Sequence, residues 1–184
     1  MCIRDRAKGV HDLIEAYATS RARDRVKLVI AGTGPALAEV RTLAADDDRV
    51  VFLTDVDDDE KPLLMRGCAT YALPTKPESD FVETFGIALA EKLLTGGGPV
   101  ITTLTGGTGE AVGDTAVIVE AGDVAALRNA LDRVVLEMSD HDKRALEWRG
   151  REHALAFDRA RVFDDLFPPH TATVTPLRLA EESV

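Results

Sequence analysis

The sequence has little of what marks a membrane protein, a disulfide-stapled protein or a zinc protein. It contains no apolar run near the roughly 20 residues that a membrane-spanning helix needs. Its first ten residues, MCIRDRAKGV, lack the apolar segment of a signal peptide. The only two cysteines, Cys2 and Cys68, lie far apart, which predicts free thiols and no metal site. We therefore expect a cytoplasmic protein.

Positive charge is also scarce. The chain has 22 Lys and Arg residues against 32 Asp and Glu residues, a formal net charge of -10. Binding to a nucleic-acid backbone needs clustered Lys and Arg that displace counterions. No nucleic-acid partner is expected, and an anionic ligand would have to be held by a few local donors.

What the sequence does contain is an alternation of short β-branched runs with longer amphipathic ones. With 184 residues, 45% of them hydrophobic, one domain can bury a sizeable core. The pattern predicts strands at residues 26–32, 49–53, 69–74, 99–103 and 116–120, and helices at residues 10–22, 35–45, 60–66, 85–94 and 124–138. Interleaved elements of this kind form right-handed crossovers. We predict a Rossmann-like, doubly wound parallel α/β sheet.

The C-terminal part of the chain has no further strand pattern. Helices are predicted at residues 140–156 and 159–166, and the Pro- and Thr-rich end, residues 168–184, is predicted to be a loose tail. The domain is therefore expected to span residues 8–167.

In such a sheet the ligand binds outside the carboxyl ends of the strands. The first loop at that edge, AGTGP, contains Gly32 and Gly34 and can bring backbone N–H groups to a phosphate. It lacks the third glycine of GxGxxG, so a plain structural turn and a ligand loop are both open. Asp55 and Asp57 in TDVDDDE have a D-x-D spacing that can hold a cation, but a solvated loop end is the favoured interpretation.

The segment ETFGIALAE, residues 83–91, places a glutamate at each end of a small and apolar stretch. Thr84 is expected to cap a helix that begins near Phe85 and presents free N–H groups to an anion. On one helix, Glu83 and Glu91 would be about 12 Å apart and about 80° apart around the axis, so both could reach one elongated ligand. A capped helix with one exposed glutamate is the alternative that these residues leave open.

These segments together resemble a known family. Residues 8–136 contain KGVHDLIEAYA, LVIAGTGP, VVFLTDV, ALPT, ETFGIALAEKLLTGGGPVITT and TGGTGEAVGDTAVIVEAGD, in that order. They are similar to the C-terminal domain of the retaining glycosyltransferases of family 4, which have the GT-B fold.

The resemblance implies a nucleotide-sugar site. Lys8 and Glu83 would be the catalytic residues, with Lys8 contacting the diphosphate and Glu83 the sugar hydroxyls. Glu91 would contact the ribose hydroxyls. Backbone groups of Thr84, Phe85, Gly86 and Ile87 would hold phosphate or sugar oxygens, and the loops at Gly32 and Val56 would lie beside the base. The implied reaction transfers a hexose with retention of configuration, with no metal and no cofactor besides the nucleotide-sugar donor.

The chain departs from the family pattern at its start. The family has a strand ending in Gly-Arg before the lysine, whereas here only MCIRDRA precedes Lys8, and Arg4 and Arg6 do not fit the motif. We expect a truncated donor-binding half whose sheet lacks its central strand and which is inactive without an acceptor domain. We leave open whether the full-length protein, of which this chain would be a part, lies at the membrane surface. TGGGP also has one residue more than the common family turn.

A nucleotide-sugar 2-epimerase and a non-catalytic nucleotide-binding domain remain alternatives.

Overall fold

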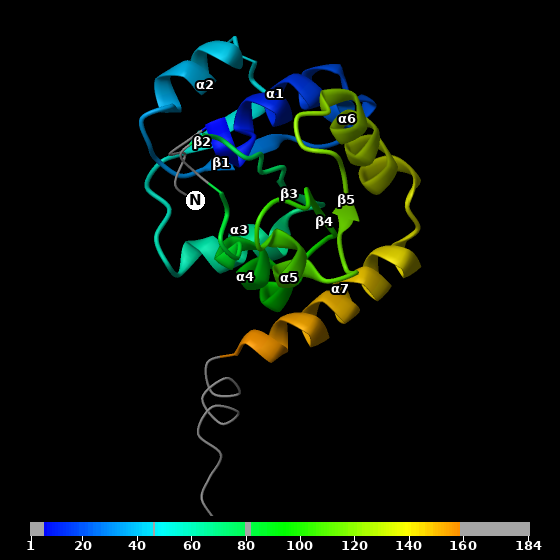
Figure 1. Ribbon diagram of the computed structural model, residues 1–184. Helices are drawn as coiled ribbons and strands as arrows, with labels where there is room; N and C mark the ends of the chain where they lie inside the picture. The colour runs from blue at the N-terminus through cyan, green and yellow to red at the C-terminus, as the bar shows by residue number, and fades with distance from the viewer. Residues whose placement is uncertain (1–5, 46, 80–81, 159–184) are drawn as a thin grey trace, which may run out of the picture.

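The computed structural model describes residues 6–45, 47–79 and 82–158, and Figure 1 shows their arrangement. Five strands alternate with helices among these residues. The strands are β1 (Leu28–Ala31), β2 (Val50–Leu53), β3 (Tyr71–Leu73), β4 (Val100–Thr102) and β5 (Val117–Ile118). The helices are α1 (Val10–Thr19), α2 (Leu37–Leu43), α3 (Glu60–Gly67), α4 (Ile87–Thr95), α5 (Thr108–Val112), α6 (Val124–Asp132) and α7 (Asp140–Ala154).

All strand pairs in the described residues are parallel, which confirms the predicted fold class. They form two sheets, β1-β2 and β3-β4-β5. In the described part of the chain β1 and β3 do not pair with each other.

Helices cover both faces of these sheets (Figure 1). One layer holds α1, α2 and α6, and the other holds α3, α4, α5 and α7. β4 shows how the alternation of strand side chains serves both layers: Ile101 packs with α1 and α6, whereas its neighbour Val100 packs with α4 and α5. On β1, by contrast, Ile30 is buried against α1 and α2 while Val29 remains 47% exposed on the other face.

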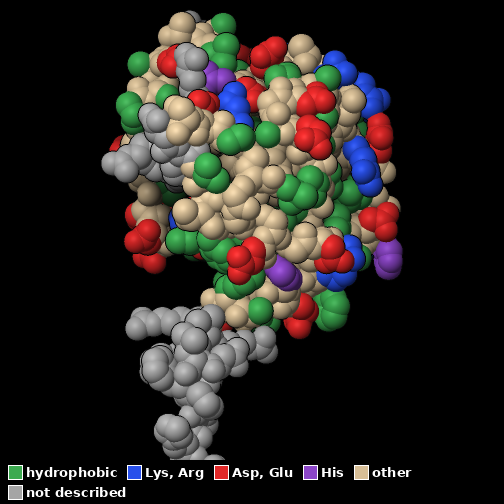
Figure 2. Space-filling model, viewed as in Figure 1, with side chains coloured by type: hydrophobic (Ala, Val, Ile, Leu, Met, Phe, Trp, Pro, Cys, Tyr) green, Lys and Arg blue, Asp and Glu red, His purple; other side chains and the backbone are tan. Residues whose placement is uncertain are grey.

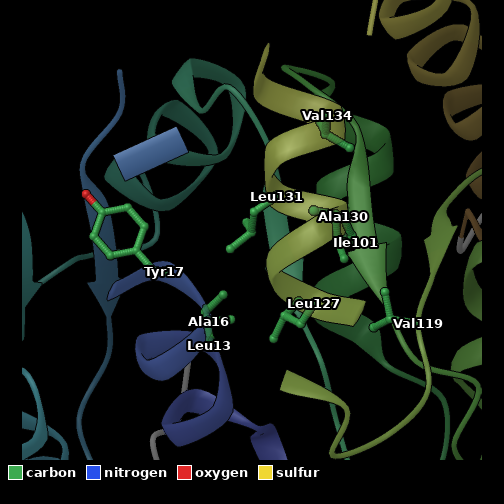
Figure 3. Packing of buried hydrophobic residues seen from close by; sticks show 9 residues of the cluster. All are labelled: Leu13, Ala16, Tyr17, Ile101, Val119, Leu127, Ala130, Leu131 and Val134. Carbon is green, nitrogen blue, oxygen red and sulfur yellow. The ribbon is translucent and has the colours of Figure 1, made fainter. Parts of the chain in front are cut away.

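The largest apolar cluster ties α1 to α6 (Figure 3). Leu13 and Ala16 of α1 face Leu127 and Leu131 of α6, whereas the ring of Tyr17 points away from α6. The cluster also includes Val119, directly after β5, and reaches residues of both sheets, namely Leu28, Val50, Ala72, Ile101 and Val117. One continuous apolar layer thus holds the two sheets together on this face.

Several element boundaries differ from the predicted ones. α1 ends at Thr19, because Ser20 is extended and its hydroxyl accepts a hydrogen bond from the N–H of Ala22, starting a short 3-10 turn, Arg21–Asp24. α5 was not predicted, since five residues are too few for a helical period. The helix predicted at 140–156 is confirmed as α7 and the 3-10 turn Leu155–Phe157. The helix predicted at 159–166 and the tail at 168–184 lie outside the described residues.

No helix in the described ranges is long and apolar enough to cross a membrane.

A buried carboxylate joins the end of α1 to α6. Asp132 accepts hydrogen bonds from the Ser20 hydroxyl (2.6 Å), the Ala22 N–H (3.0 Å) and Nε of Arg21 (3.2 Å). Burial alone would raise the pKa of Asp132, but these hydrogen bonds and the Arg21 charge outweigh it and lower that pKa.

Asp132→Ala should therefore lower the free energy of unfolding by about 1–3 kcal/mol at pH 7, because buried donors lose their acceptor. A lowered carboxyl pKa stabilises the fold above the unfolded value of about 3.9, and this contribution is lost as pH falls through the folded pKa. Urea unfolding at pH 7 and pH 3 checks both points. A difference between wild type and variant that is as large at pH 3 as at pH 7 would contradict the charged role of Asp132.

Candidate ligand-binding site

The amino end of α4 lies at the carboxyl edge of the β3-β4-β5 sheet. α4 begins at Ile87, and Gly86 caps it in the left-handed conformation with φ 87°. The carbonyl of Gly86 accepts hydrogen bonds from the N–H groups of Leu89 (2.8 Å) and Ala90 (3.3 Å). The first-turn N–H groups, starting at Ile87, point out of the helix toward any ligand at this end.

The prediction that Thr84 caps this helix is wrong. The left-handed glycine sets the start, so Thr84 and Phe85 belong to the preceding bend, and Thr84 is exposed. Glu83 consequently lies outside the helix, and the separation of about 12 Å calculated for it and Glu91 on one helix does not apply.

A second loop holds the bend that carries Glu83. The N–H of Gly107 donates to the carbonyl of Glu83 at 2.8 Å. The contact is so close that a Cβ on Gly107 would lie 2.0 Å from the carbonyl oxygen of Thr84. Only glycine fits at residue 107, because any side chain would push the bend away.

Hydroxyl groups of threonine residues hold this second loop in place. Thr75 contacts Thr103 (3.1 Å) and Thr105 (2.6 Å) through side-chain oxygens, and Thr108 donates to the carbonyl of Thr103 at 2.6 Å. Thr75, Thr103 and Thr108 are almost fully buried. Satisfied buried hydroxyls of this kind make the carboxyl ends of β3 and β4 rigid.

Lys8 approaches the same bend from the N-terminal side. Gly9, in the left-handed conformation with φ 68°, lies against Pro74, where a Cβ would meet the Pro74 carbonyl oxygen at 1.9 Å. This contact brings the ammonium group of Lys8 to the carboxylate of Glu83, to which it donates a hydrogen bond. The two side chains are only 17% and 12% exposed. The structure therefore brings together the two residues predicted to be catalytic.

Glu91, about one turn into α4, is the other glutamate of the motif. Its Oε2 lies 2.5 Å from Nζ of Lys61 on α3, and the two side chains are 41% and 33% exposed. Lys61 was not singled out from the sequence. It stands in an acidic run, and no sequence pattern links α3 to α4.

The loops expected beside the base lie at the ends of β1 and β2. The N–H of Gly32 donates to the carbonyl of Leu53 at 2.8 Å, which keeps the two strand ends together. Val56 lines a cavity of about 470 Å³ with Phe52, Thr54 and Leu63, whereas Gly32 is not among its lining residues. Asp57 is used locally, since its Oδ1 accepts hydrogen bonds from the N–H groups of Asp59 (3.0 Å) and Glu60 (2.8 Å) at the start of α3.

Acidic side chains are spread over the face shown in Figure 2, while Lys and Arg gather mainly along one edge. In this chain of net charge -10, Lys8 and Lys61 each balance the charge of one glutamate of the motif through an ion pair.

Comparison with known families places the chain in one of them. The family model "Glycosyl transferases group 1" matches residues 2–137. The chain belongs to this family. All nine residues predicted for the site lie within the matched range.

Individual glycosyltransferases agree with the family. The chain is 33% identical over 158 residues to a GDP-mannose-dependent alpha-(1-6)-phosphatidylinositol monomannoside mannosyltransferase of Mycobacterium tuberculosis, covering 81% of this chain and 40% of that protein. It is 29% identical over 152 residues to the N-acetyl-alpha-D-glucosaminyl L-malate synthase of Bacillus anthracis, covering 80% of this chain and 37% of that protein. The chain thus spans about two fifths of the length of these relatives.

Solved glycosyltransferase structures share the fold. HepE of Anabaena, in complex with UDP and glucose, superposes with a TM-score of 0.71 at 22% identity, over 90% of this chain and 46% of that chain. The catalytic domain of the cholesterol-alpha-glucosyltransferase of Helicobacter pylori superposes with a TM-score of 0.70 at 20% identity, over 85% of this chain and 96% of that chain. The Rossmann-like domain of a GT-B glycosyltransferase is therefore the fold of this family member.

Proposed function

We propose that this chain is the donor-binding domain of a retaining glycosyltransferase and binds a nucleoside-diphosphate sugar at the amino end of α4. The observation that carries the proposal is the pair formed by Lys8 and Glu83 beside that helix end. A cation, a carboxylate and free N–H groups at one place suit a ligand that has both phosphates and hydroxyls. HepE of the same fold has been solved with UDP-glucose, which supports this ligand class.

Each group has a distinct part in binding. The N–H groups at Ile87 and the helix dipole favour the diphosphate, and Lys8 adds a full positive charge. Glu83 accepts hydrogen bonds from the sugar hydroxyls, and Glu91 accepts them from the ribose hydroxyls. The base would lie at the ends of β1 and β2, near Gly32 and Val56.

The proposed reaction transfers a hexose to an acceptor with retention of configuration. The bond between the anomeric carbon and the diphosphate oxygen breaks, the acceptor hydroxyl oxygen bonds to that carbon from the same face, and the hydroxyl proton passes to the departing diphosphate oxygen. Lys8 and the amino end of α4 stabilise the negative charge that develops on the leaving diphosphate. Glu83 holds the sugar in position and forms no covalent bond to it. The proposal includes no metal and no cofactor.

Acceptor binding requires groups beyond those placed here. Attack on the sugar needs an acceptor held within reach of the anomeric carbon. We therefore expect this chain alone to show little or no transfer. Robust transfer to a sugar acceptor by this chain would contradict that division of labour.

A thermal-shift titration with UDP-, GDP-, ADP- and dTDP-sugars tests the donor site. A ligand at 100 times its Kd adds about 2.7 kcal/mol to the free energy of unfolding, which raises Tm by roughly 5–10 °C in a domain of this size. Glu91→Ala should weaken binding about 10-fold or more, because ribose hydroxyls lose a charged acceptor.

Glu152→Ala is the matched control, since Glu152 is an exposed glutamate on α7. It should leave the ligand-induced shift unchanged. If none of the four nucleotide sugars raises Tm, the proposed donor site is wrong. If a nucleotide binds equally well to Glu91→Ala, Glu91 is a helix charge without a role in recognition.

A further inference from the structure

Lys61 makes an ion pair with the glutamate proposed to bind ribose, and no role has been assigned to it. We propose that Lys61 is a positioning residue that holds the Glu91 carboxylate for recognition of a ribose diol, so that the site selects ribonucleotides over 2′-deoxyribonucleotides. This inference rests on the proposed function, because it concerns the same site.

The position of Lys61 is not explained by its own helix. It is the second residue of α3, in the first turn, where its N–H donates to the carbonyl of Asp57 at 3.1 Å. A positive charge at the amino end of a helix is unfavourable, because the helix dipole places partial positive charge there. The partner that its ammonium group contacts is Glu91 on the neighbouring helix, at 2.5 Å.

The pair also contributes little as a structural link. Both side chains are more than 30% exposed, and ion pairs that water reaches to this extent add little to stability. α3 and α4 also lie side by side through several pairs of residues. A role in placing the carboxylate therefore explains the contact better than a role in joining the helices.

The geometry of the contact suits a diol. Lys61 contacts Oε2 of Glu91, which leaves Oε1 outside this contact. The cis hydroxyls of ribose offer two O–H donors, and an ionised carboxylate can accept both. A long glutamate side chain held by a cation loses less rotational freedom when the ligand binds, so ribose binding should be stronger with Lys61 in place.

The two hydroxyls make the test specific. The dissociation constants of UDP and 2′-deoxy-UDP, and of GDP and 2′-deoxy-GDP, are measured by calorimetry for wild type, Lys61→Met, Lys61→Arg, Glu91→Gln and the double variant Lys61→Met/Glu91→Gln. Wild type should prefer the ribonucleotide about 10-fold, in the range of one hydrogen bond to a charged group. Glu91→Gln should abolish most of this preference.

Lys61→Met should reduce the ribose preference at least 3-fold, whereas Lys61→Arg, which keeps the positive charge, should retain it. The double variant should show the same preference for the ribonucleotide as Glu91→Gln, because both changes act on one interaction. Lys27→Met, at an exposed lysine before β1, is the control and should keep the wild-type preference.

The outcomes separate this inference from the proposed function. If Glu91→Gln loses the ribose preference but Lys61→Met keeps it, the role of Lys61 is refuted and the donor site stands. If wild type binds none of the four nucleotides, both are refuted. If the nucleotides bind but Glu91→Gln keeps the full ribose preference, the ribose role of Glu91 and this inference are refuted, and nucleotide binding at the amino end of α4 stands. A structural role alone would lower Tm in Lys61→Met without changing the preference.

Discussion

A Gly107→Ala chain should lose most of its affinity for nucleotide sugars while it keeps its fold. The added Cβ would lie 2.0 Å from the Thr84 carbonyl oxygen and 2.8 Å from Cα of Phe85, so the bend that carries Glu83 must move. A displacement of about 1 Å at groups that position a substrate can lower activity about 100-fold. Calorimetric titration with the nucleotide sugar that gives the largest thermal shift measures this loss.

The effect on stability should be smaller. Gly107 has a φ of -85°, which alanine adopts without strain, so the destabilisation comes from the contact alone and should be about 1–3 kcal/mol. Gly109→Ala is the matched control, because its Cβ would meet only Leu104 at 3.4 Å. Gly109→Ala should bind like wild type. Equal affinities for Gly107→Ala and Gly109→Ala would show that the bend at Glu83 does not form the site.

Lys92→Met should cause the largest loss of stability. Lys92 is 1% exposed, and its ammonium group donates to the carbonyls of Gly96 (2.5 Å), Gly97 (2.5 Å) and Gly98 (3.1 Å). Methionine fills the same space but leaves these carbonyls without this donor. We expect the free energy of unfolding to fall by about 2–4 kcal/mol and Tm by roughly 5–15 °C.

The pH dependence identifies the cause of this loss. Burial lowers the pKa of Lys92, although nearby Cys68 and Glu147 oppose the shift. The unfolded chain therefore binds more protons at this group between the lowered pKa and the usual value of about 10.4, so stability from Lys92 rises with pH in that window. The Tm difference between wild type and Lys92→Met should widen from pH 7 toward pH 10. A difference that narrows, or a variant as stable as wild type, would contradict this role.

Much of the fold follows from sequence periodicity. Each of the five predicted strands is present, because β-branched runs such as VKLVIAG and PVITT favour strands, and PVITT is buried on both faces of its parallel sheet. The long helix α7 begins where Ser139 caps it through the N–H of Asp142, and this cap precedes a long polar and apolar repeat. The strands are shorter than predicted, because hydrogen-bonded pairing with the neighbouring strand ends before the β-branched pattern does.

The sequence predicted most residues of the candidate site, but not the start of α4 or the partner of Glu91. Glu83, Gly86 and Glu91 stood out as charged or flexible residues within an apolar segment. The start of α4 was misplaced because a threonine and a left-handed glycine are both plausible caps, and only the contact with the TGGTG loop decides between them. The pair of Lys61 with Glu91 joins two helices, and no local pattern encodes it.

The turn TGGGP is held together by a buried lysine. Gly96, Gly97 and Gly98 all have positive φ values, and their carbonyls converge on Lys92. The N–H of Gly97 also donates to Glu147 of α7 at 2.7 Å. The contact between this turn and the lysine of the preceding helix was not predicted from the sequence.

Amide mapping by NMR tests the central claim most directly. The ¹⁵N-labelled chain is titrated with UDP-glucose and with GDP-mannose, and the backbone amide shifts are followed residue by residue. A nucleotide sugar at the amino end of α4 should move the amides of Phe85, Gly86 and Ile87 most, followed by those of Lys8 and Gly9. Shifts that leave these amides unchanged, or that gather around the cavity beside Ile14 and Tyr17 instead, would contradict a donor site at α4.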